Sequence, residues 1–380
     1  MRNLAFLILG VNMFLFTSCN GEKNKGLPEP QKVKDLIIKV NDHWQQTHPE
    51  HGRAFWDNAA YHTGNIEAYK VTRLKRYLDY SREWAERNQW MGAKSTNPSQ
   101  WRYSYGETDE YVLFGDWQIC FQTYIDLFQL VDDPNEKMIA RAREVMEYQI
   151  QTDTIDYWWW SDGLYMVMPV MTKLYKLTGN EKYLDKLYEY YSYAKSIMYD
   201  EETGLFYRDA KYVFPKHKTL NNRKDFWSRG NGWVFAGFAK VLDDLPKDSP
   251  YFNSFVKDFR RMAQSLKSIQ HSNGYWTRSL LDSEHAPGPE TSGTAFFCYG
   301  FLWGINNEIL EKDEFIPTAI KAWEYLTETA LQNDGSIGYV QPIGERAIPG
   351  QVVDKNSTSN FGTGAFLLAA SELYRLVSRR

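Results

Sequence analysis

The sequence predicts an all-α protein built as an (α/α)6 barrel, and three observations support this fold. Helix-like segments come in pairs along the chain, a segment rich in tyrosine and tryptophan first and a charged amphipathic segment second. Short turns join the two members of a pair, whereas long loops join one pair to the next. No long alternation of apolar and polar residues, as a strand would require, competes with this pattern. Six inner and six outer helices connected in this order close into a barrel.

Five hairpins follow from the pattern, and the two ends of the chain supply a sixth. The five are Trp56 to Val71 with Leu74 to Asn88, Val112 to Leu130 with Glu136 to Ile150, Leu164 to Leu177 with Lys182 to Met198, Gly232 to Leu242 with Phe252 to Gln270, and Thr294 to Leu310 with Phe315 to Leu331. The second members carry one apolar stripe at helical spacing, and the first members are apolar on more sides, as helices buried on both faces must be. Gly364 to Val377 and Val33 to Gln46 have no neighbour in sequence, so we expect them to pair and close the ring.

Composition indicates a large globular protein that binds sugars rather than nucleic acid. The chain has 380 residues, 43% hydrophobic and 24% charged, which suits one large domain. The net charge is −4 and no basic block is present, which argues against a nucleic-acid partner. Aromatic residues make up 16% of the chain, and many of them fall in predicted loops. Rings exposed in loops are typical of carbohydrate binding.

The first residues resemble a bacterial lipoprotein signal. Arg2 precedes an apolar run, Leu4 to Phe16, that is too short for a mature membrane span and ends just before Cys19. We therefore expect residues 1–19 to be a signal peptide with Cys19 lipidated, residues 20–30 a polar tether, and residues 31–380 the catalytic domain. This predicts a monomer anchored to a membrane on its periplasmic face, with cell-surface display as the alternative.

Cys120 and Cys298, the other two cysteines, lie in apolar helix-like runs. We expect two buried free thiols, with a disulfide between them as the alternative, and the residues show no metal-ligand spacing.

The long loops precede the inner helices, so they meet at one end of the barrel. Helix N-termini present free N–H groups and a positive dipole end there, which favours an anionic ligand. Asp116 and Asp162 occupy corresponding places at the starts of two successive inner helices, and each has a neighbouring tryptophan. An acid beside apolar rings has a raised pKa, and two carboxylates in different surroundings can divide the roles of acid and base. The alternative for either residue is an ordinary helix cap.

Other candidates for substrate binding lie in the same loops. The motif Trp227-Ser228-Arg229-Gly230-Asn231-Gly232-Trp233 combines a guanidinium fork suited to a carboxylate with two indoles, although a structural ion pair is the alternative for Arg229. The corresponding segments before the other inner helices add Trp56, Tyr61, Thr63, Trp160, Thr291 and Ser292.

Four motifs resemble the unsaturated rhamnogalacturonyl hydrolases (glycoside hydrolase family 105) and their relatives, the unsaturated glucuronyl hydrolases (family 88). They are residues 160–166, 204–207, 226–233 and 290–295, and the resemblance covers roughly residues 33–377. It implies an (α/α)6 enzyme, without metal or cofactor, that removes a 4,5-unsaturated uronic acid from a lyase-generated oligosaccharide by hydrating the ring double bond. It further implies that Asp162 is the acid/base, that Asp116 holds the unsaturated ring, and that Arg229 and Trp233 bind substrate.

The chain departs from this family pattern at two places. Arg208 stands where the family commonly has a histidine, and residues 117–161 lack the histidine often found between the two aspartates. Arg208 offers five donors and a permanent charge, which favours a substrate with a second anionic group. The alternative is that Arg208 pairs with Asp209 or Glu201. His62, His217 and His285 lie near the predicted site, where ordinary packing roles are the simpler interpretation.

Two other functions fit parts of the pattern. An inverting glycosidase would use Asp116 and Asp162 as base and acid. A glycan-binding lipoprotein would also be rich in tryptophan, but it would need neither the facing carboxylates nor a buried arginine.

Overall fold

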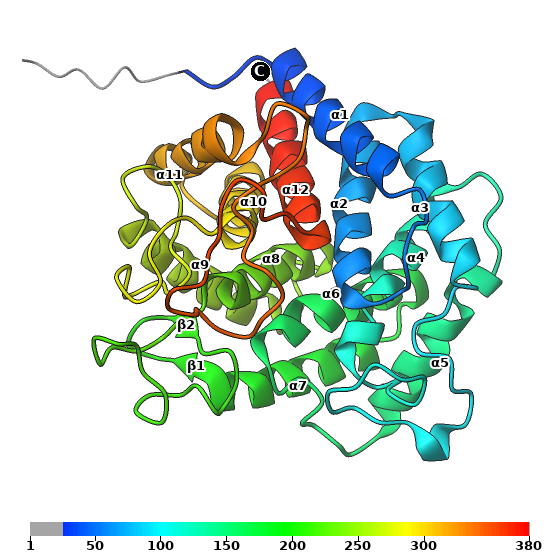
Figure 1. Ribbon diagram of the computed structural model, residues 1–380. Helices are drawn as coiled ribbons and strands as arrows, with labels where there is room; N and C mark the ends of the chain where they lie inside the picture. Colours follow the sequence, from blue (N-terminus) through cyan, green and yellow to red (C-terminus); the bar gives the residue numbers. More distant parts are fainter. Residues whose placement is uncertain (1–25, 380) are drawn as a thin grey trace, which may run out of the picture.

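The computed structural model describes residues 26–379, which form two concentric rings of helices (Figure 1). The predicted signal peptide, Cys19 and most of the tether lie outside the described residues. The inner helices are α2 (Trp56–Thr72), α4 (Cys120–Leu130), α6 (Ser161–Thr178), α8 (Ser228–Asp244), α10 (Thr291–Asn306) and α12 (Asn360–Ser378). The outer helices are α1 (Pro30–Thr47), α3 (Lys75–Arg87), α5 (Lys137–Gln151), α7 (Lys182–Met198), α9 (Phe252–Ser268) and α11 (Lys312–Tyr325).

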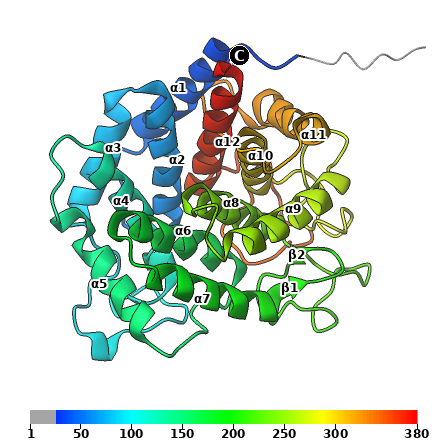
Figure 2. The ribbon, with the colours of Figure 1, turned by 180° about the vertical axis from the view of Figure 1, so that it is seen from behind.

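The predicted ring closure is confirmed. Each inner helix packs against the inner helix before it and the one after it, and α12 packs against α2. Helix α1 packs mainly on α12 rather than on α2, as the pairing of the two chain ends requires. Both ribbon views show α1 beside the C-terminus (Figures 1 and 2).

Two glycines allow the closing pair of helices to touch backbone to backbone. A Cβ atom added at Gly64 on α2 would lie 2.2 Å from the carbonyl oxygen of Gly364 on α12, and one added at Gly364 would lie 2.4 Å from the carbonyl oxygen of Ala60. Any side chain at either position would push the helices apart, so these glycines set the distance at which the ring closes.

The two rings bury their side chains differently. Helix α10 is buried along almost its whole length because it contacts other helices on every side. Helix α9 buries one stripe, which includes Phe255, Phe259, Met262 and Leu266, and leaves its charged face exposed. None of the helices in the described part of the chain combines the length and the apolar character needed to cross a membrane.

The elements outside the rings are short and lie mostly in the long loops. They are the 3-10 turns η1 (Pro98–Gln100) and η2 (Gly115–Trp117), the two-residue strands β1 (Tyr199–Asp200) and β2 (Leu205–Phe206), and a π-helical turn, η3 (Leu326–Ala330), which continues α11. Cys120 and Cys298 are buried and free, as predicted.

One predicted element differs in a way that matters for function. We expected a continuous helix from Val112, but α4 begins only at Cys120 and Asp116 lies on the separate turn η2. The turn closes through hydrogen bonds to the carbonyl oxygen of Gly115 from the N–H groups of Gln118 and Ile119. Asp116 is therefore presented by a turn at the mouth of the barrel and not by the helix itself.

Candidate active site

Asp162 lies in the first turn of α6, and a short bridge holds it in place. The backbone of Trp160 pairs with that of Asp209, and the N–H of Ser161 donates to the carbonyl oxygen of Arg208 at 2.8 Å. The hydroxyl of Ser161 then donates to Asp162 Oδ2 at 3.0 Å. The start of α6 is thus tied to the segment that carries Arg208.

Asn231 holds the same segment from the other side. Its side-chain oxygen accepts the N–H of Phe206 at 2.9 Å, and its side-chain nitrogen donates to the carbonyl oxygen of Phe206 at 2.9 Å. Asn231 is fully buried in α8. The asparagine of the Trp227–Trp233 motif therefore positions Arg208 through the backbone and does not contact substrate.

The ring of Trp160 is buried and packs against Gly115 and Gly163, the neighbours of Asp116 and Asp162. It is 2% exposed and stacks on Phe114 with ring centroids 4.8 Å apart. Glycines allow this fit, because a Cβ at Gly115 or at Gly163 would lie 3.2 Å from the Trp160 ring. We expected Trp160 to contact substrate, but the structure buries it. Trp159, the next ring along, is the partly exposed one.

Both aspartates favour the protonated form. Burial raises the pKa of Asp116 well above its usual value, and the nearby charge of Asp162 raises it further. Burial also raises the pKa of Asp162, but Arg208, the Ser161 hydroxyl and Arg229 oppose this shift. The two carboxyls are therefore neighbours with different surroundings, as acid–base chemistry at neutral pH requires.

Arg208 is paired and still faces the site. Its Nη1 donates to Asp209 Oδ2 at 2.6 Å and lies 3.7 Å from Glu345 Oε2, and its guanidinium lies 5.4 Å from the ring centroid of Trp159. The pairing with Asp209 confirms one of the two partners expected from sequence. Asp162 also raises the pKa of Arg208, after the opposing effect of burial. Arg208 Nε is buried and has no hydrogen-bond partner among residues 26–379. The side chain as a whole is 15% exposed, so part of the guanidinium stays accessible.

Arg229 is used differently from our expectation. Its Nη1 donates to the carbonyl oxygen of Gln341 at 2.6 Å and its Nη2 to that of Pro342 at 2.8 Å. The guanidinium lies between the rings of Trp227 and Phe361, 4.5 and 4.6 Å from their centroids, and is 1% exposed. The two terminal nitrogens of the Arg229 guanidinium therefore hold the loop before α12. Two of the five guanidinium N–H donors are used in this way, and Nη1 also lies 3.8 Å from Glu290 Oε1, so the structure gives Arg229 a positioning role, while its predicted contact with a substrate carboxylate stays a prediction.

Glu290, which we had not singled out, supports the same loop. It is fully buried at the N-cap of α10, where its carboxylate accepts the N–H groups of Ser292 and Gly293 and the Ser292 hydroxyl. It also accepts the N–H of Gln341 at 3.1 Å. A glutamate directly before Thr-Ser-Gly at the start of a helix is typical of such a cap, so this role of Glu290 could have been predicted from the sequence.

Several other predicted contacts face protein rather than the mouth. Tyr61 donates to Asn41 on α1, and the Thr63 and Tyr165 hydroxyls lie 2.7 Å apart in the core. Thr291 is bonded to Tyr325 and Ser292 to Glu290. The sequence placed these residues near the correct helix ends but did not predict the direction in which their side chains point.

The tryptophans of the predicted set divide in the same way. Trp227 donates to the side-chain oxygen of Gln341, and Trp233 is fully buried. Trp56 remains partly exposed beside Trp233 and Phe361. Trp56 is therefore the one predicted ring that keeps an accessible face.

A third acid at the mouth was missed. Asp57, next to Trp56 in the first turn of α2, is partly buried, and burial raises its pKa against the opposing charge of Arg53. Its charge also raises the pKa of Asp116. Its neighbour Asn58 accepts a hydrogen bond from Asn360 at 3.0 Å, across the seam where the ring closes.

The three histidines near the mouth have packing partners. His62 Nδ1 lies 2.8 Å from the Ser81 hydroxyl, and burial lowers its pKa well below the usual value. His217 bonds to Asp225, and His285 accepts the N–H of Leu220. Within residues 26–379, no group of three or more His, Cys, Asp or Glu side chains is arranged to hold a metal ion.

Coupled carboxyls with raised pKa values, flanked by aromatic rings at the mouth of an (α/α)6 barrel, define a glycoside hydrolase. The glycosyl hydrolase family 88 model matches residues 30–377. The chain therefore belongs to glycosyl hydrolase family 88, the second of the two related families that the motifs resemble. Members of family 105 share the fold at much lower identity.

Relatives are similar over nearly the whole chain. The unsaturated 3S-rhamnoglycuronyl hydrolase of Formosa agariphila is 34% identical over 99% of this chain and 100% of its own length. A solved structure of a family 88 glycosyl hydrolase from Bacteroides vulgatus is 59% identical, with a TM-score of 0.89, and the match covers 92% of this chain and 99% of that one. Another solved structure, described as a polysaccharide lyase, is 63% identical with a TM-score of 0.90 and the same coverage.

Proposed function

We propose that this glycoside hydrolase removes a terminal 4,5-unsaturated uronic acid from an oligosaccharide by hydrating the ring double bond. The observation that carries the proposal is the pair Asp116 and Asp162, two neighbouring carboxyls whose pKa values are raised by burial. The name of the Formosa agariphila relative supports the choice of an unsaturated uronide. No cofactor is needed, because the reaction adds only water.

In the proposed reaction Asp162 carries the proton. Its carboxyl donates to C4 of the unsaturated ring while a water molecule adds to C5, and the resulting carboxylate accepts the proton that this water loses. The net change is addition of water across the double bond. The product is a hemiketal, which opens and releases the remaining sugar. Arg208 and Arg229 stabilise the carboxylate form of Asp162 between these steps.

Asp116 is proposed to bind the ring in its neutral form. A protonated carboxyl has both a donor and an acceptor, so it can bond to sugar hydroxyls without repelling the uronate charge. Its pKa is raised further than burial alone would achieve, because Asp162 and Asp57 lie close. Trp56 and Trp159 supply the partly exposed aromatic faces on which the sugar rings lie.

We further propose that the sugar next to the unsaturated residue is anionic. The Arg208 side chain is 15% exposed beside the partly exposed ring of Trp159, and Lys211, 66% exposed, lies 3.6 Å from Glu345, which also neighbours Arg208. Asp209 and Glu345 offset part of this positive charge, so the preference for an anion depends on Arg208 itself. A fixed guanidinium recognises sulfate or carboxylate oxygens better than hydroxyls.

The general proposal is tested by following ultraviolet absorbance on lyase-digested fragments of rhamnogalacturonan, glycosaminoglycan, ulvan and arabinogalactan. Hydration destroys the conjugated double bond, so absorbance falls on turnover. A polysaccharide lyase would create that chromophore from an intact polymer, and an ordinary inverting glycosidase would leave it unchanged. Either of these results overturns the proposed reaction.

The preference for an anionic sugar is tested separately with Arg208→His. The ratio of kcat/KM on sulfated or uronate-bearing substrates to that on neutral ones should fall by about tenfold, the effect of one charge-assisted hydrogen bond. Lys211→Ala, which removes a nearby exposed charge, is the matched control. An unchanged ratio in Arg208→His would assign Arg208 to the scaffold.

We also propose that the enzyme acts as a monomer held at a membrane through a lipid on Cys19. The support is the sequence alone, in which an apolar run ends just before this cysteine. Cys19→Ala should move the protein from the detergent phase to the aqueous phase in a partition experiment, with activity per molecule retained. Partition of wild type and variant into the same phase would refute the lipid anchor.

A further inference from the structure

A cavity of about 250 Å³ lies at the end of the barrel opposite the candidate active site. Its walls come from the C-terminal halves of α2, α6, α8 and α12 and from the end of α10. Lys240 on α8 lies 11 residues after Arg229, or about 16 Å further along the helix. The cavity is thus separate from the acids at the mouth.

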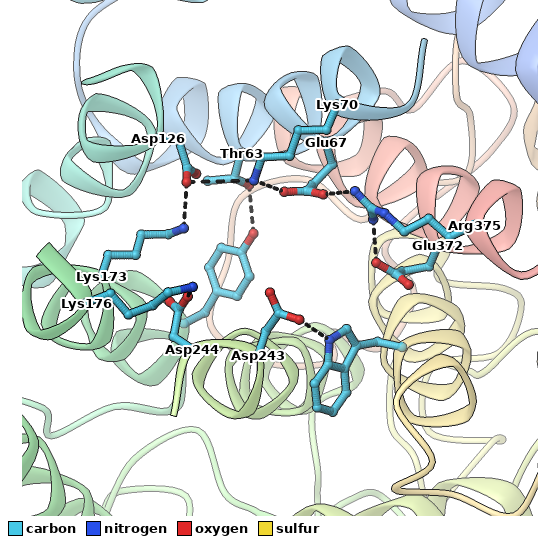
Figure 3. A network of polar contacts seen from close by, with 12 residues as sticks. Thr63, Glu67, Lys70, Asp126, Lys173, Lys176, Asp243, Asp244, Glu372 and Arg375 are labelled. Atoms are coloured by element: carbon cyan, nitrogen blue, oxygen red, sulfur yellow. Dashed lines mark hydrogen bonds and ion pairs between the residues drawn. The ribbon is translucent and has the colours of Figure 1, made fainter. Parts of the chain in front are cut away.

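Most carboxylate oxygens at this cavity accept a hydrogen bond from a neighbouring side chain. Glu67 accepts from Lys70 and Arg375, and Glu372 also accepts from Arg375 (Figure 3). Glu372 accepts a second bond from Asn306, and Asp244 accepts from Lys176 and Thr172. In each of these three groups both oxygens have a partner. Asp243, the fourth carboxylate at the cavity, accepts from Trp303 at 3.0 Å. The acceptors are therefore mostly satisfied.

Two donors that line the same cavity have no hydrogen-bond partner in the described part of the protein. Lys240 is 9% exposed, and within residues 26–379 its ammonium group has no hydrogen bond or ion pair and remains open to the cavity. Its one specific contact is the Tyr165 ring, whose centroid lies 5.6 Å away. Tyr299, 5% exposed, likewise has no hydrogen bond in the described part of the chain. Burial keeps its hydroxyl protonated, because it raises the pKa well above the usual value.

The neighbouring cations differ from Lys240 in having partners. Lys173 donates to Asp126 at 2.7 Å and Lys70 to Glu67 at 2.8 Å, while Lys240 lies near both lysines without a carboxylate of its own. Burial and the charge of Lys173 lower the pKa of Lys240 to about 8. An unpaired ammonium in such a position is costly, and an anion placed against it would remove that cost.

We infer that this cavity binds a small monovalent anion of the carboxylate type, held by Lys240 Nζ and Tyr299 Oη. One negative charge offsets the one ammonium that has no partner. Two carboxylate oxygens match the two free donors, and a third donor is not required. The volume is sufficient for formate or acetate with water, since a water molecule occupies about 30 Å³. The inference is independent of the proposed reaction, because the two sites share no residue.

The experiment compares thermal unfolding in sodium formate, sodium acetate and sodium HEPES at pH 7 and equal ionic strength. HEPES has no carboxylate, so it controls for general salt effects. Wild type should gain about 2 °C or more in formate or acetate, and the gain should saturate with concentration, as binding to the folded state requires. A gain that is equal in HEPES, or that never saturates, overturns the inference.

Two variants locate the effect. Lys240→Met keeps the length of the side chain and removes the charge, so the saturable gain should vanish while turnover stays unchanged. Lys257→Met, at an exposed position on α9, should retain the full gain. Retention of the gain in Lys240→Met contradicts the inference.

A binding measurement covers the case in which Lys240→Met does not fold. Isothermal titration of formate should give a dissociation constant for wild type, and Tyr299→Phe should weaken it by about threefold to tenfold through loss of one hydrogen bond. Equal affinity in Tyr299→Phe, or no heat of binding to wild type, refutes the assigned site.

Discussion

Asp116 and Asp126 lie ten positions apart in one segment, yet their pKa values are shifted in opposite directions. Burial raises the pKa of Asp116, and the charge of Asp162 raises it further against the opposing charge of Arg208. Burial acts in the same direction on Asp126, but the ammonium groups of Lys173 and Lys70 outweigh it and hold the pKa below its usual range. The two ends of the barrel therefore use the same side chain for different purposes. Carboxyls with raised pKa values lie at the mouth, where we propose acid–base chemistry, and ion-paired carboxylates lie at the other end, where they stabilise the fold.

The largest expected effect comes from removing the acid at the mouth. Asp162→Asn keeps the shape of the side chain and removes the transferable proton, so kcat should fall by about two to four orders of magnitude while substrate still binds. Single-turnover kinetics and a binding titration on an unsaturated uronide measure the two quantities. Turnover near that of wild type would make Asp162 a helix cap.

The matching change at the other end should act on stability instead. Asp126→Asn leaves Lys173 and part of the charge of Lys70 uncompensated, which should lower the free energy of unfolding by about 3 to 5 kcal/mol. Denaturant unfolding measures this, and kcat per folded molecule should remain that of wild type. A large loss of kcat in the folded fraction would mean that the two ends are not independent.

Arg229 is a buried cation at the mouth of the barrel. Like Lys173 and Lys70 at the other end, it is hydrogen-bonded to other parts of the protein, and Arg229→Lys tests the contribution of these bonds. Lysine cannot donate to the carbonyl oxygens of Gln341 and Pro342 in the same fork, so the free energy of unfolding should fall by about 1 to 3 kcal/mol. KM should rise as the free energy of unfolding falls, because the loop before α12 becomes less firmly held. Weaker substrate binding with unchanged stability would instead support direct contact between Arg229 and the uronate.

The smallest effect is a gain in stability that depends on pH. A carboxyl whose folded pKa is raised binds protons more tightly in the folded state, so ionisation above the unfolded pKa destabilises the fold. Asp116→Asn removes this effect and should unfold at a higher temperature than wild type at pH 7 to 8. The difference should shrink as the pH falls below the unfolded pKa of about 3.9 and vanish near about pH 2 to 3, where the wild-type group is protonated in both states. A difference independent of pH would contradict the raised pKa.

The sequence predicted the barrel well because helix periodicity and loop length are local signals. It also placed Asp116 and Asp162 at the same end, since both precede inner helices. It could not give the direction of the Arg229 side chain, which depends on a loop more than 100 positions away. The paired charges around Asp126 were also missed. Lys173 is an isolated basic residue in an apolar helix, and only the packing of α6 against α4 reveals its partner, Asp126.

The contact between Gly64 and Gly364 has a consequence for how the protein is made. The two residues are 300 positions apart (364 minus 64), and they touch through backbone atoms at the seam of the ring. A ribosome has therefore synthesised nearly the entire polypeptide before α2 can meet its last neighbour. Until then, the apolar faces of α2 and α10 that α12 covers remain open to water and to chaperones. A premature stop codon before Asn360 would leave an open ring with most of its helices present but no closing contact.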